Sequence, residues 1–217
     1  MRTFISYVTK YSKVSGRIKR YLDEYSFNCF LAHEDIPPQT HWPQELVKNL
    51  VECDLFLALL TPEYKTSFYC QQEVGYVCCR RIEILPILIS ADPPMGLIGD
   101  IQGIKFNKDD FDSSCWKIVK HVAKIDSISR PVIKKLIDEF GSASSYDGAG
   151  RKAKRILNQF AFTHSQAKRA MRYIDTNEQI YESKTARPHI LEFIESYGEH
   201  FDPQKVKDYM QRSQRWL

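Results

Sequence analysis

Side chains that could take part in catalysis or binding lie in three short segments of the chain. The first is Phe4–Tyr7, the second is His33–Pro38 with Trp42 close behind it, and the third is Ser67–Val74. They hold carboxylates, hydroxyls and an imidazole, which are groups that proteins use as acids, bases or electrostatic stabilisers. A glutamate in an early helical turn, as Glu73 is expected to be, is commonly a surface residue that suits the helix dipole. The residue types alone therefore assign no reaction.

Several familiar catalytic motifs are missing from the sequence. It holds no G-x-x-x-x-G-K-[ST] or G-x-G-x-x-G phosphate loop, no G-x-S-x-G nucleophile elbow and no H-E-x-x-H. The six cysteines form no C-x-x-C pair, and most stand beside large apolar residues, as small core residues do. These absences argue against ordinary nucleotide-triphosphate enzymes, dehydrogenases, hydrolases and metalloproteases, and we expect no metal site.

The elements that must position the three segments follow from the hydrophobic pattern of the first 125 residues. Expected strands at 3–7, 28–31, 54–60, 84–89 and 103–106 alternate with helical spacing at 13–24, 43–53, 67–81 and 112–125. Pro37 and Pro38 predict an exposed loop. The alternation predicts a flavodoxin-like α/β domain over 1–127, with a parallel sheet covered by helices on both faces. Ligands bind at the carboxyl ends of the strands in such sheets, where the three segments are expected to lie.

The pattern changes from about residue 128. Pro131–Phe140 is expected to be a helix, and the Gly- and Ser-rich stretch 141–150 is expected to be a linker. Helical spacing over 151–162, 164–174, 188–197 and 203–216 then predicts a small all-helical domain over 128–217. A short hairpin at 180–185 remains an alternative.

Charge is distributed unevenly along the chain. The net charge is +4, but residues 130–217 hold 16 basic and 11 acidic side chains, whereas 1–129 hold 15 and 16. The segment 151–172 holds seven basic residues and no acidic one. Such a segment attracts nucleic acid, an anionic ligand or an acidic partner, or it is simply a solvated helix face. The sequence leaves these alternatives open.

Composition also bears on where the protein works. The longest apolar runs, Leu55–Leu60 and Ile84–Ile89, have six residues each, whereas a membrane-spanning helix needs about 20. The residues Met1–Tyr7 contain no charged-then-apolar leader. Many cysteines without a leader are typical of a reducing compartment. We therefore expect a cytoplasmic protein that does not enter a membrane.

Four motifs in chain order carry a family resemblance. The chain shows Phe4–Tyr7, Asp35–Pro38 with Trp42, Cys53–Leu57 and Ser67–Glu73, which follow F-[IVL]-S-Y, D-I-x-P-G, C-D-x-x-[IVL] and S-x-W-C-x-x-E. With them the chain resembles the Toll/interleukin-1 receptor (TIR) domain family, particularly its prokaryotic, NAD-cleaving members of anti-phage defence. The likeness covers residues 1–125. Gln39 stands where the family usually has glycine, and Tyr69 stands where it usually has tryptophan.

The resemblance implies a substrate and a site. Catalytic TIR domains cleave the bond between nicotinamide and ribose in NAD, so NAD is the expected substrate and no separate cofactor is expected. The family pattern gives Glu73 the role of stabilising an oxocarbenium-like transition state. The loop after the second strand is expected to reach a second copy, so that self-association completes the site. The residues expected to bind the substrate are Phe4, Ser6, Tyr7, His33, Asp35, Ile36, Trp42 and Tyr69.

Three alternative functions are compatible with the resemblance. In the first, the enzyme makes linear, cyclic or conjugated ADP-ribose as a signal for a separate effector protein in anti-phage defence. In the second, the protein is a non-enzymatic adaptor that docks other TIR domains and has no need of Glu73. In the third, it is a TIR effector whose basic helical tail binds nucleic acid. A tail that packs on the TIR domain or mediates oligomerisation is the simpler alternative to the third role.

Overall fold

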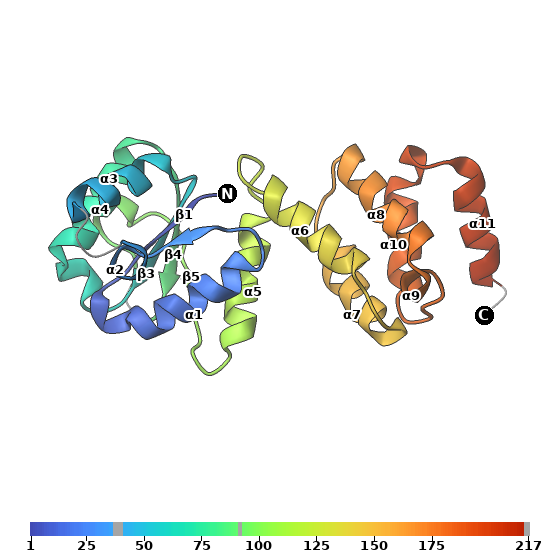
Figure 1. The fold of residues 1–217 in the computed structure, drawn as a ribbon, viewed down its shortest axis with the longest axis horizontal. Helices are drawn as coiled ribbons and strands as arrows, with labels where there is room; N and C mark the ends of the chain where they lie inside the picture. Colours follow the sequence, from blue (N-terminus) through green and yellow to red (C-terminus); the bar gives the residue numbers. More distant parts are fainter. Residues whose placement is uncertain (37–40, 91–92, 215–217) are drawn as a thin grey trace. The chain divides into compact units, whose positions relative to one another are not determined.

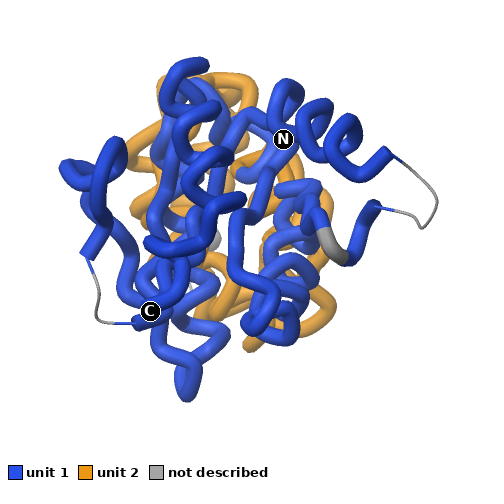
Figure 2. The backbone as a smooth tube through the Cα atoms, turned by 90° about the vertical axis from the view of Figure 1, so that its left-hand side faces the viewer, with its two compact units in different colours: residues 1–132 blue, residues 133–217 orange. Residues whose placement is uncertain are grey.

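The computed structural model describes residues 1–36, 41–90 and 93–214. The chain divides into two compact units, Met1–Val132 and Ile133–Leu217, which are coloured separately in Figure 2. Helix α6 (Arg130–Gly141) carries the chain from the first unit into the second.

The first unit is built on a sheet of five strands in the order β2-β1-β3-β4-β5. All four pairings between neighbouring strands are parallel. This is the order of a doubly wound α/β fold, so the predicted flavodoxin-like sheet is confirmed. Every residue of β3 is buried, as expected for a strand covered on both faces. The strands are β1 (Thr3–Ser6), β2 (Cys29–Phe30), β3 (Leu55–Leu60), β4 (Glu83–Leu88) and β5 (Ile104–Lys105).

Helices cover both faces of this sheet (Figure 1). Helices α1 and α5 lie together on one face, where the rings of Tyr21 and Phe111 meet edge to face. Helices α3 and α4 pack together on the other face. The helices of this unit are α1 (Ser12–Asp23), α2 (Ala32–Asp35), α3 (Trp42–Glu52), α4 (Phe68–Cys79) and α5 (Phe111–Val122), with 3₁₀ turns η1 (Thr9–Tyr11), η2 (Tyr64–Thr66) and η3 (Gly96–Ile98). The sequence pattern missed the one-turn helix α2, which lies in a stretch expected to be a loop.

The face covered by α3 and α4 positions the candidate site. Side chains alternate between the two faces along a strand, so Ser6 shares a face with Phe4, which is packed in the core below α3 and α4. The sequence therefore places a hydroxyl at the carboxyl end of β1, directly facing α4. The buried residues that build this core are Phe4, Phe56, Ala58, Leu60, Leu46, Leu50, Cys70, Val74 and Val77.

The second unit is helical, as predicted. No strand occurs in 133–214, the part of this unit that the structure describes. Residues Glu178–Tyr181 form a short helix, so the hairpin that the pattern left open at 180–185 is not formed. Asp202 caps the last helix, since its Oδ1 accepts a hydrogen bond from the Gln204 amide at 2.9 Å. The helices that follow α6 are α7 (Tyr146–Ile156), α8 (His164–Thr176), α9 (Glu178–Tyr181), α10 (Arg187–Tyr197) and α11 (Pro203–Gln214), with a 3₁₀ turn η4 (Gly198–His200).

The Gly- and Ser-rich stretch 141–150 is not a linker, and that prediction was wrong. The Ser145 side chain accepts a hydrogen bond from the Gly148 amide and caps α7, which begins at the next residue. Gly150 lies inside α7, where a Cβ atom would collide with Thr185. A Cβ atom on Gly141 would likewise collide with the Tyr173 ring. Gly141 permits a close approach of α6 to α8, and Gly150 permits a close approach of α7 to the turn before α10. Composition does not distinguish this use of glycine from a flexible link.

Candidate active site

Glu73 is held in the second turn of α4. The helix begins where the Ser67 side chain accepts a hydrogen bond from the Cys70 amide at 3.4 Å, the arrangement of an ordinary N-cap. Glu73 lies on the buried face of the helix together with Cys70 and Val77. Only 7% of its surface is exposed. A buried carboxylate is costly unless it is hydrogen-bonded, so its partners define the site.

Two hydroxyl groups supply these partners in series. Ser6 Oγ donates a hydrogen bond to Glu73 Oε2 at 2.5 Å. The Tyr64 hydroxyl donates in turn to Ser6 Oγ at 2.7 Å. Each hydroxyl thus donates to the next group, and the chain of donors ends on the carboxylate. This direction suits an ionised glutamate, because an ionised carboxylate only accepts hydrogen bonds.

The protonation of Glu73 is finely balanced. Burial raises its pKa to about 7, although the Ser6 hydrogen bond acts in the opposite direction. Both forms of the carboxyl group are therefore populated near neutral pH. A cationic ligand close to Glu73 would favour the ionised form and lower this pKa. A carboxyl group shifted this far by burial, at the edge of the sheet where ligands bind, is a reasonable candidate for a functional group.

The neighbouring acidic groups remain protonated. Burial raises the pKa of the Tyr64 phenol well above its ordinary value. Burial likewise raises the pKa of the Cys70 thiol, with the Ser67 hydrogen bond opposing it. Tyr64 therefore acts as a hydrogen-bond donor at neutral pH, and Cys70 is an unreactive core thiol. Among these side chains, Glu73 is the group whose charge changes near pH 7.

No motif in the sequence singles out Tyr64. The residue begins η2, which follows β3 at the carboxyl edge of the sheet, and only 2% of its surface is exposed. Its main-chain oxygen accepts a hydrogen bond from Gln71 Nε2 at 3.0 Å, which ties η2 to α4. The available signal in the sequence was a tyrosine that follows a fully apolar expected strand by four residues. That signal indicates a position but not the partner, because Ser6 is far away in the sequence.

The structure gives the predicted residues of β1 different environments. Ser6 contacts Glu73 through its hydroxyl group. Phe4 is 1% exposed and its ring stacks on Phe56 at a centroid distance of 5.6 Å. Tyr7 is buried directly after the end of β1. Phe4 is therefore a core residue that supports the strand, and Ser6 is the residue of this strand that reaches the carboxylate.

The predicted residues after β2 lie around α2 and α3. Asp35 Oδ2 accepts a hydrogen bond from the Leu31 amide at 2.7 Å and lies 3.1 Å from Lys19 Nζ. Ile36 is half-buried and packs against the core below α3 and α4. The ion pair holds Asp35 against α1. The His33 side chain, the two prolines of the predicted loop and Gln39 lie outside the described residues.

Two of the predicted aromatic residues, Trp42 and Tyr69, contact each other. Trp42 at the start of α3 and Tyr69 in the first turn of α4 meet edge to face, with ring centroids 5.6 Å apart. Trp42 is half-buried, whereas 62% of the Tyr69 surface is exposed. Tyr69 is thus on the solvent side of the turn that precedes Glu73. It is available to a ligand or a partner that approaches the outside of this edge.

The space beside the site is small. A cavity of about 170 Å³ is lined by Tyr64, Gln71 and neighbouring residues of η2 and η3. Pockets that hold drug-sized ligands measure about 300–1,000 Å³, so this cavity alone does not accommodate a dinucleotide.

Among the described residues, no group of three His, Cys, Asp or Glu side chains is placed to hold a metal ion. No described helix has the length and apolar character needed to cross a membrane.

Comparison with known proteins places this arrangement in a family. Residues 3–119 match the family model described as TIR domain. The chain belongs to the TIR domain family. The matched residues of this TIR protein include Ser6, Tyr64 and Glu73, and the family predicted from the four motifs is confirmed.

A solved TIR domain is also similar to this TIR protein. It is the crystal structure of the TIR domain of the Toll-related receptor TRR-2 from the lower metazoan Hydra magnipapillata, with 12% sequence identity and a TM-score of 0.47. The match covers 55% of this chain and 95% of the Hydra chain. No curated protein matches the sequence of the chain.

Proposed function

We propose that this TIR protein is an enzyme that cleaves the bond between nicotinamide and ribose in NAD. The observation that supports it is the Glu73 carboxylate, which is buried at the carboxyl edge of the sheet and hydrogen-bonded by Ser6. Its pKa of about 7 allows it to be ionised at neutral pH when a cationic substrate is bound. The TIR family includes NAD-cleaving enzymes and non-enzymatic adaptors, so this carboxylate is the feature on which the choice depends.

The reaction requires little from the protein beyond electrostatic stabilisation of the transition state. The bond between ribose C1′ and the nicotinamide ring nitrogen breaks, and its electron pair neutralises the ring cation. The leaving group therefore needs no proton, unlike the leaving group of an ordinary glycosidase substrate. Positive charge develops on the ribose in the transition state, and the negative Glu73 carboxylate stabilises that charge. Because the site is largely buried, the same charge acts more strongly than it would in water.

The nucleophile then decides the product. Attack by water on C1′ gives ADP-ribose and releases one proton. Attack by an adenine nitrogen of the same molecule gives a cyclic ADP-ribose. Positioning of the two nucleophiles decides between these outcomes. We propose that the product is a signal read by a separate effector protein in anti-phage defence, and the free cysteines support a cytoplasmic setting.

Ser6 and Tyr64 act as positioning residues in this proposal. Ser6 Oγ fixes one oxygen of the carboxylate, and Tyr64 fixes the orientation of Ser6. The two hydroxyls hold the negative charge in place without neutralising it. A carboxylate that is held in place before the substrate binds does not have to reorganise during the reaction.

Glu73 is buried in the single chain. A substrate can therefore contact it only if the edge of the sheet opens or if a second copy of the chain completes the site. The apolar side chains beside the site favour the second copy. Phe68, the first residue of α4, is 80% exposed, and Leu97 in η3, which packs against α4, is 72% exposed. Contiguous apolar patches on a protein surface mark sites of association. TIR domains commonly self-associate, and we propose that this surface meets a second copy of the chain.

The test measures nicotinamide released from NAD by the purified protein, with product analysis by chromatography and mass spectrometry. We expect Glu73→Gln to lower the rate by at least about 100-fold, the usual effect of removing one electrostatic stabiliser of a transition state. Glu83→Gln makes the same chemical change at an exposed position at the start of β4 and should leave the rate unchanged. A Glu73→Gln protein that keeps its fold and its activity would overturn the assignment.

The second candidate function is a TIR protein that only docks other TIR domains. The exposed side chains of Phe68 and Leu97 favour it, because a docking surface requires them and does not require Glu73. Wild-type protein that self-associates but releases no nicotinamide would select this function. Release of nicotinamide that depends on Glu73 would select the enzyme.

A further inference from the structure

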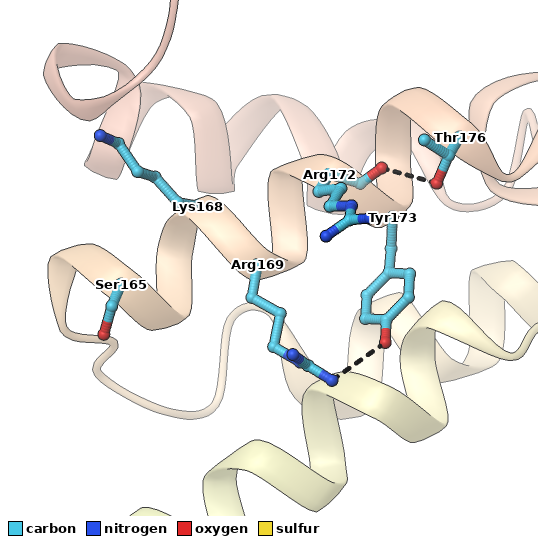
Figure 3. A pocket seen from close by; sticks show the side chains of 6 residues that line it. All are labelled: Ser165, Lys168, Arg169, Arg172, Tyr173 and Thr176. Carbon is cyan, nitrogen blue, oxygen red and sulfur yellow. Dashed lines mark hydrogen bonds between the residues drawn. The ribbon is translucent and has the colours of Figure 1, made fainter.

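The second unit carries a groove along one face of α8. Its volume is about 550 Å³, and its lining residues recur at intervals of three and four along that single helix (Figure 3). Residues at these intervals share one face of a helix. The lining residues are Ser165, Lys168, Arg169, Arg172, Tyr173 and Thr176.

One cation of the groove is fixed to the helix below it. Arg169 Nε lies 2.6 Å from Asp138 Oδ1 of α6, and the Tyr173 hydroxyl donates to the same oxygen at 3.0 Å. In Figure 3, the Arg169 and Tyr173 side chains extend toward the same neighbouring helix. These contacts position α8 on α6. Arg169 is therefore a structural residue of the groove whose charge is already balanced.

The other two cations are not balanced. Lys168 and Arg172 are exposed, and neither has an acidic partner among the residues that the structure describes. They stand four residues apart, which corresponds to about 6 Å along the helix axis. The Ser165 hydroxyl lies on the same face, whereas the Thr176 hydroxyl donates its hydrogen bond to the Arg172 main-chain oxygen at 2.8 Å. The groove thus presents two available positive charges and one nearby serine hydroxyl, with no carboxylate in its lining.

Nucleic-acid phosphates match this set of groups. Lys, Arg, Ser, Thr and Tyr side chains make most protein contacts to the sugar-phosphate backbone. A protein partner would instead need an apolar centre in the interface, and a membrane surface would need apolar side chains to insert. Among the described residues of the second unit, Tyr146 is the only large hydrophobic side chain that is exposed. The surface therefore favours an electrostatic ligand over both of those partners.

We propose that the α8 groove binds the phosphate backbone of a nucleic-acid strand through Lys168 and Arg172. The uneven charge of the chain supports this, since residues 130–217 hold 16 basic and 11 acidic side chains. Nothing in the groove selects particular bases, so binding is independent of sequence and depends strongly on salt. The proposal is independent of NAD cleavage, because none of these residues belongs to the site around Glu73.

The experiment measures binding of the full chain to fluorescent 20-nucleotide single-stranded DNA, single-stranded RNA and duplex DNA by anisotropy, from 50 to 200 mM salt. The test variant is Lys168→Glu with Arg172→Glu. The control is Lys117→Glu with Lys207→Glu, which makes the same change in net charge at exposed positions on α5 and α11. Circular dichroism and thermal melting establish that both variants are folded.

We expect the test variant to weaken binding at least tenfold at 50 mM salt. The slope of log affinity against log salt should become shallower by about 2, because each of the two side chains neutralises one phosphate in the wild-type complex. The control should weaken binding by less than twofold. Equal weakening by both variants, or no binding by wild-type protein at 50 mM salt, would overturn the proposal. Tighter binding to polyglutamate than to any of the three nucleic acids would also overturn it, and would assign the groove to an acidic protein.

Discussion

The hydroxyl of Ser6 donates a 2.5 Å hydrogen bond to Glu73, although 67 residues separate the two in the sequence. The contact exists because β1 ends at Ser6 and because the second turn of α4 passes over that strand end. It joins the first strand of the sheet to the helix that carries the proposed catalytic carboxylate. Its strength and direction therefore bear on both the activity and the stability of the first unit.

The rate of NAD cleavage should depend on pH through Glu73. Because burial raises the pKa of Glu73 to about 7, the free protein holds this group protonated in acid and ionised in base. We expect kcat/KM to rise with pH through an apparent pKa near 7, since kcat/KM reports the ionisations of the free enzyme. Initial rates of nicotinamide release from pH 5 to 9 measure this. A flat profile across that range would contradict the assignment.

Removing the Ser6 hydroxyl should shift that profile. The hydrogen bond from Ser6 lowers the pKa of Glu73, so Ser6→Ala should raise this pKa and move the acidic limb to higher pH. The variant also leaves the buried Tyr64 hydroxyl without its acceptor, which costs about 1–3 kcal/mol of stability. Tyr64→Phe keeps the bond between Ser6 and Glu73, so its acidic limb should stay in place. An unmoved limb in Ser6→Ala would show that the hydroxyl does not act on the carboxylate.

Glu73→Gln should stabilise the protein in neutral and alkaline solution. The pKa of Glu73 is about 7 in the folded chain against an ordinary value of 4.5. Between these values the folded state binds more protons than the unfolded state, so the wild-type free energy of unfolding falls as pH rises from 4.5 to 7. The decrease amounts to at most about 3 kcal/mol. Urea unfolding at pH 5 and pH 8 should show Glu73→Gln gaining stability relative to wild type at pH 8, and Glu83→Gln should show no such gain.

Phe68→Ser should weaken self-association without weakening the fold. The side chain is 80% exposed in the isolated chain, so its removal should change stability by no more than about 0.5 kcal/mol. Sedimentation velocity across a concentration series measures the association. Val47→Ser removes another exposed apolar side chain, on α3, and should leave the association unchanged. Equal self-association in wild type and Phe68→Ser would place the interface elsewhere.

Two glycine substitutions in helices should have opposite effects. Gly75 lies within α4, and a Cβ atom there would have no neighbour within 4 Å, so Gly75→Ala should stabilise by about 0.5–1 kcal/mol. Gly150→Ala in α7 would force a Cβ atom into Thr185 and should destabilise the second unit despite the better helix propensity of alanine. Thermal melting of the two variants tests this. Stabilisation by Gly150→Ala would mean that α7 and Thr185 are not in contact.

The fold was predictable where the hydrophobic pattern alone decides it. Two apolar runs in the sequence became β3 and β4. In α1, apolar residues recur every four positions at Val14, Ile18 and Leu22. Both patterns identify elements that bury one or both faces. The stretch 141–150 was not predictable, because Gly141 and Gly150 are explained by contacts with Tyr173 and Thr185, which come from later in the chain. Local composition carries no information about such distant neighbours.

The candidate site was predictable in part for a similar reason. Ser6 and Glu73 belong to motifs that have a characteristic spacing within each segment. Tyr64 belongs to no such motif, and its role appears only when the end of β3 brings it next to Ser6. Asp35 was predicted from its motif, but its pairing with Lys19 depends on how α2 lies against α1. Motifs thus identified the residues, whereas the folded sheet supplied the contacts between them.

The cysteines of the first unit make α4 an accessible place for a spectroscopic reporter. Cys29, Cys53, Cys70 and Cys115 are buried, whereas Cys79 is exposed as the last residue of α4. A maleimide dye should attach to Cys79 first, on the same helix as Glu73, with Cys78→Ser removing the half-buried neighbour. Its fluorescence would then follow nucleotide binding and assembly in real time, without any engineered thiol.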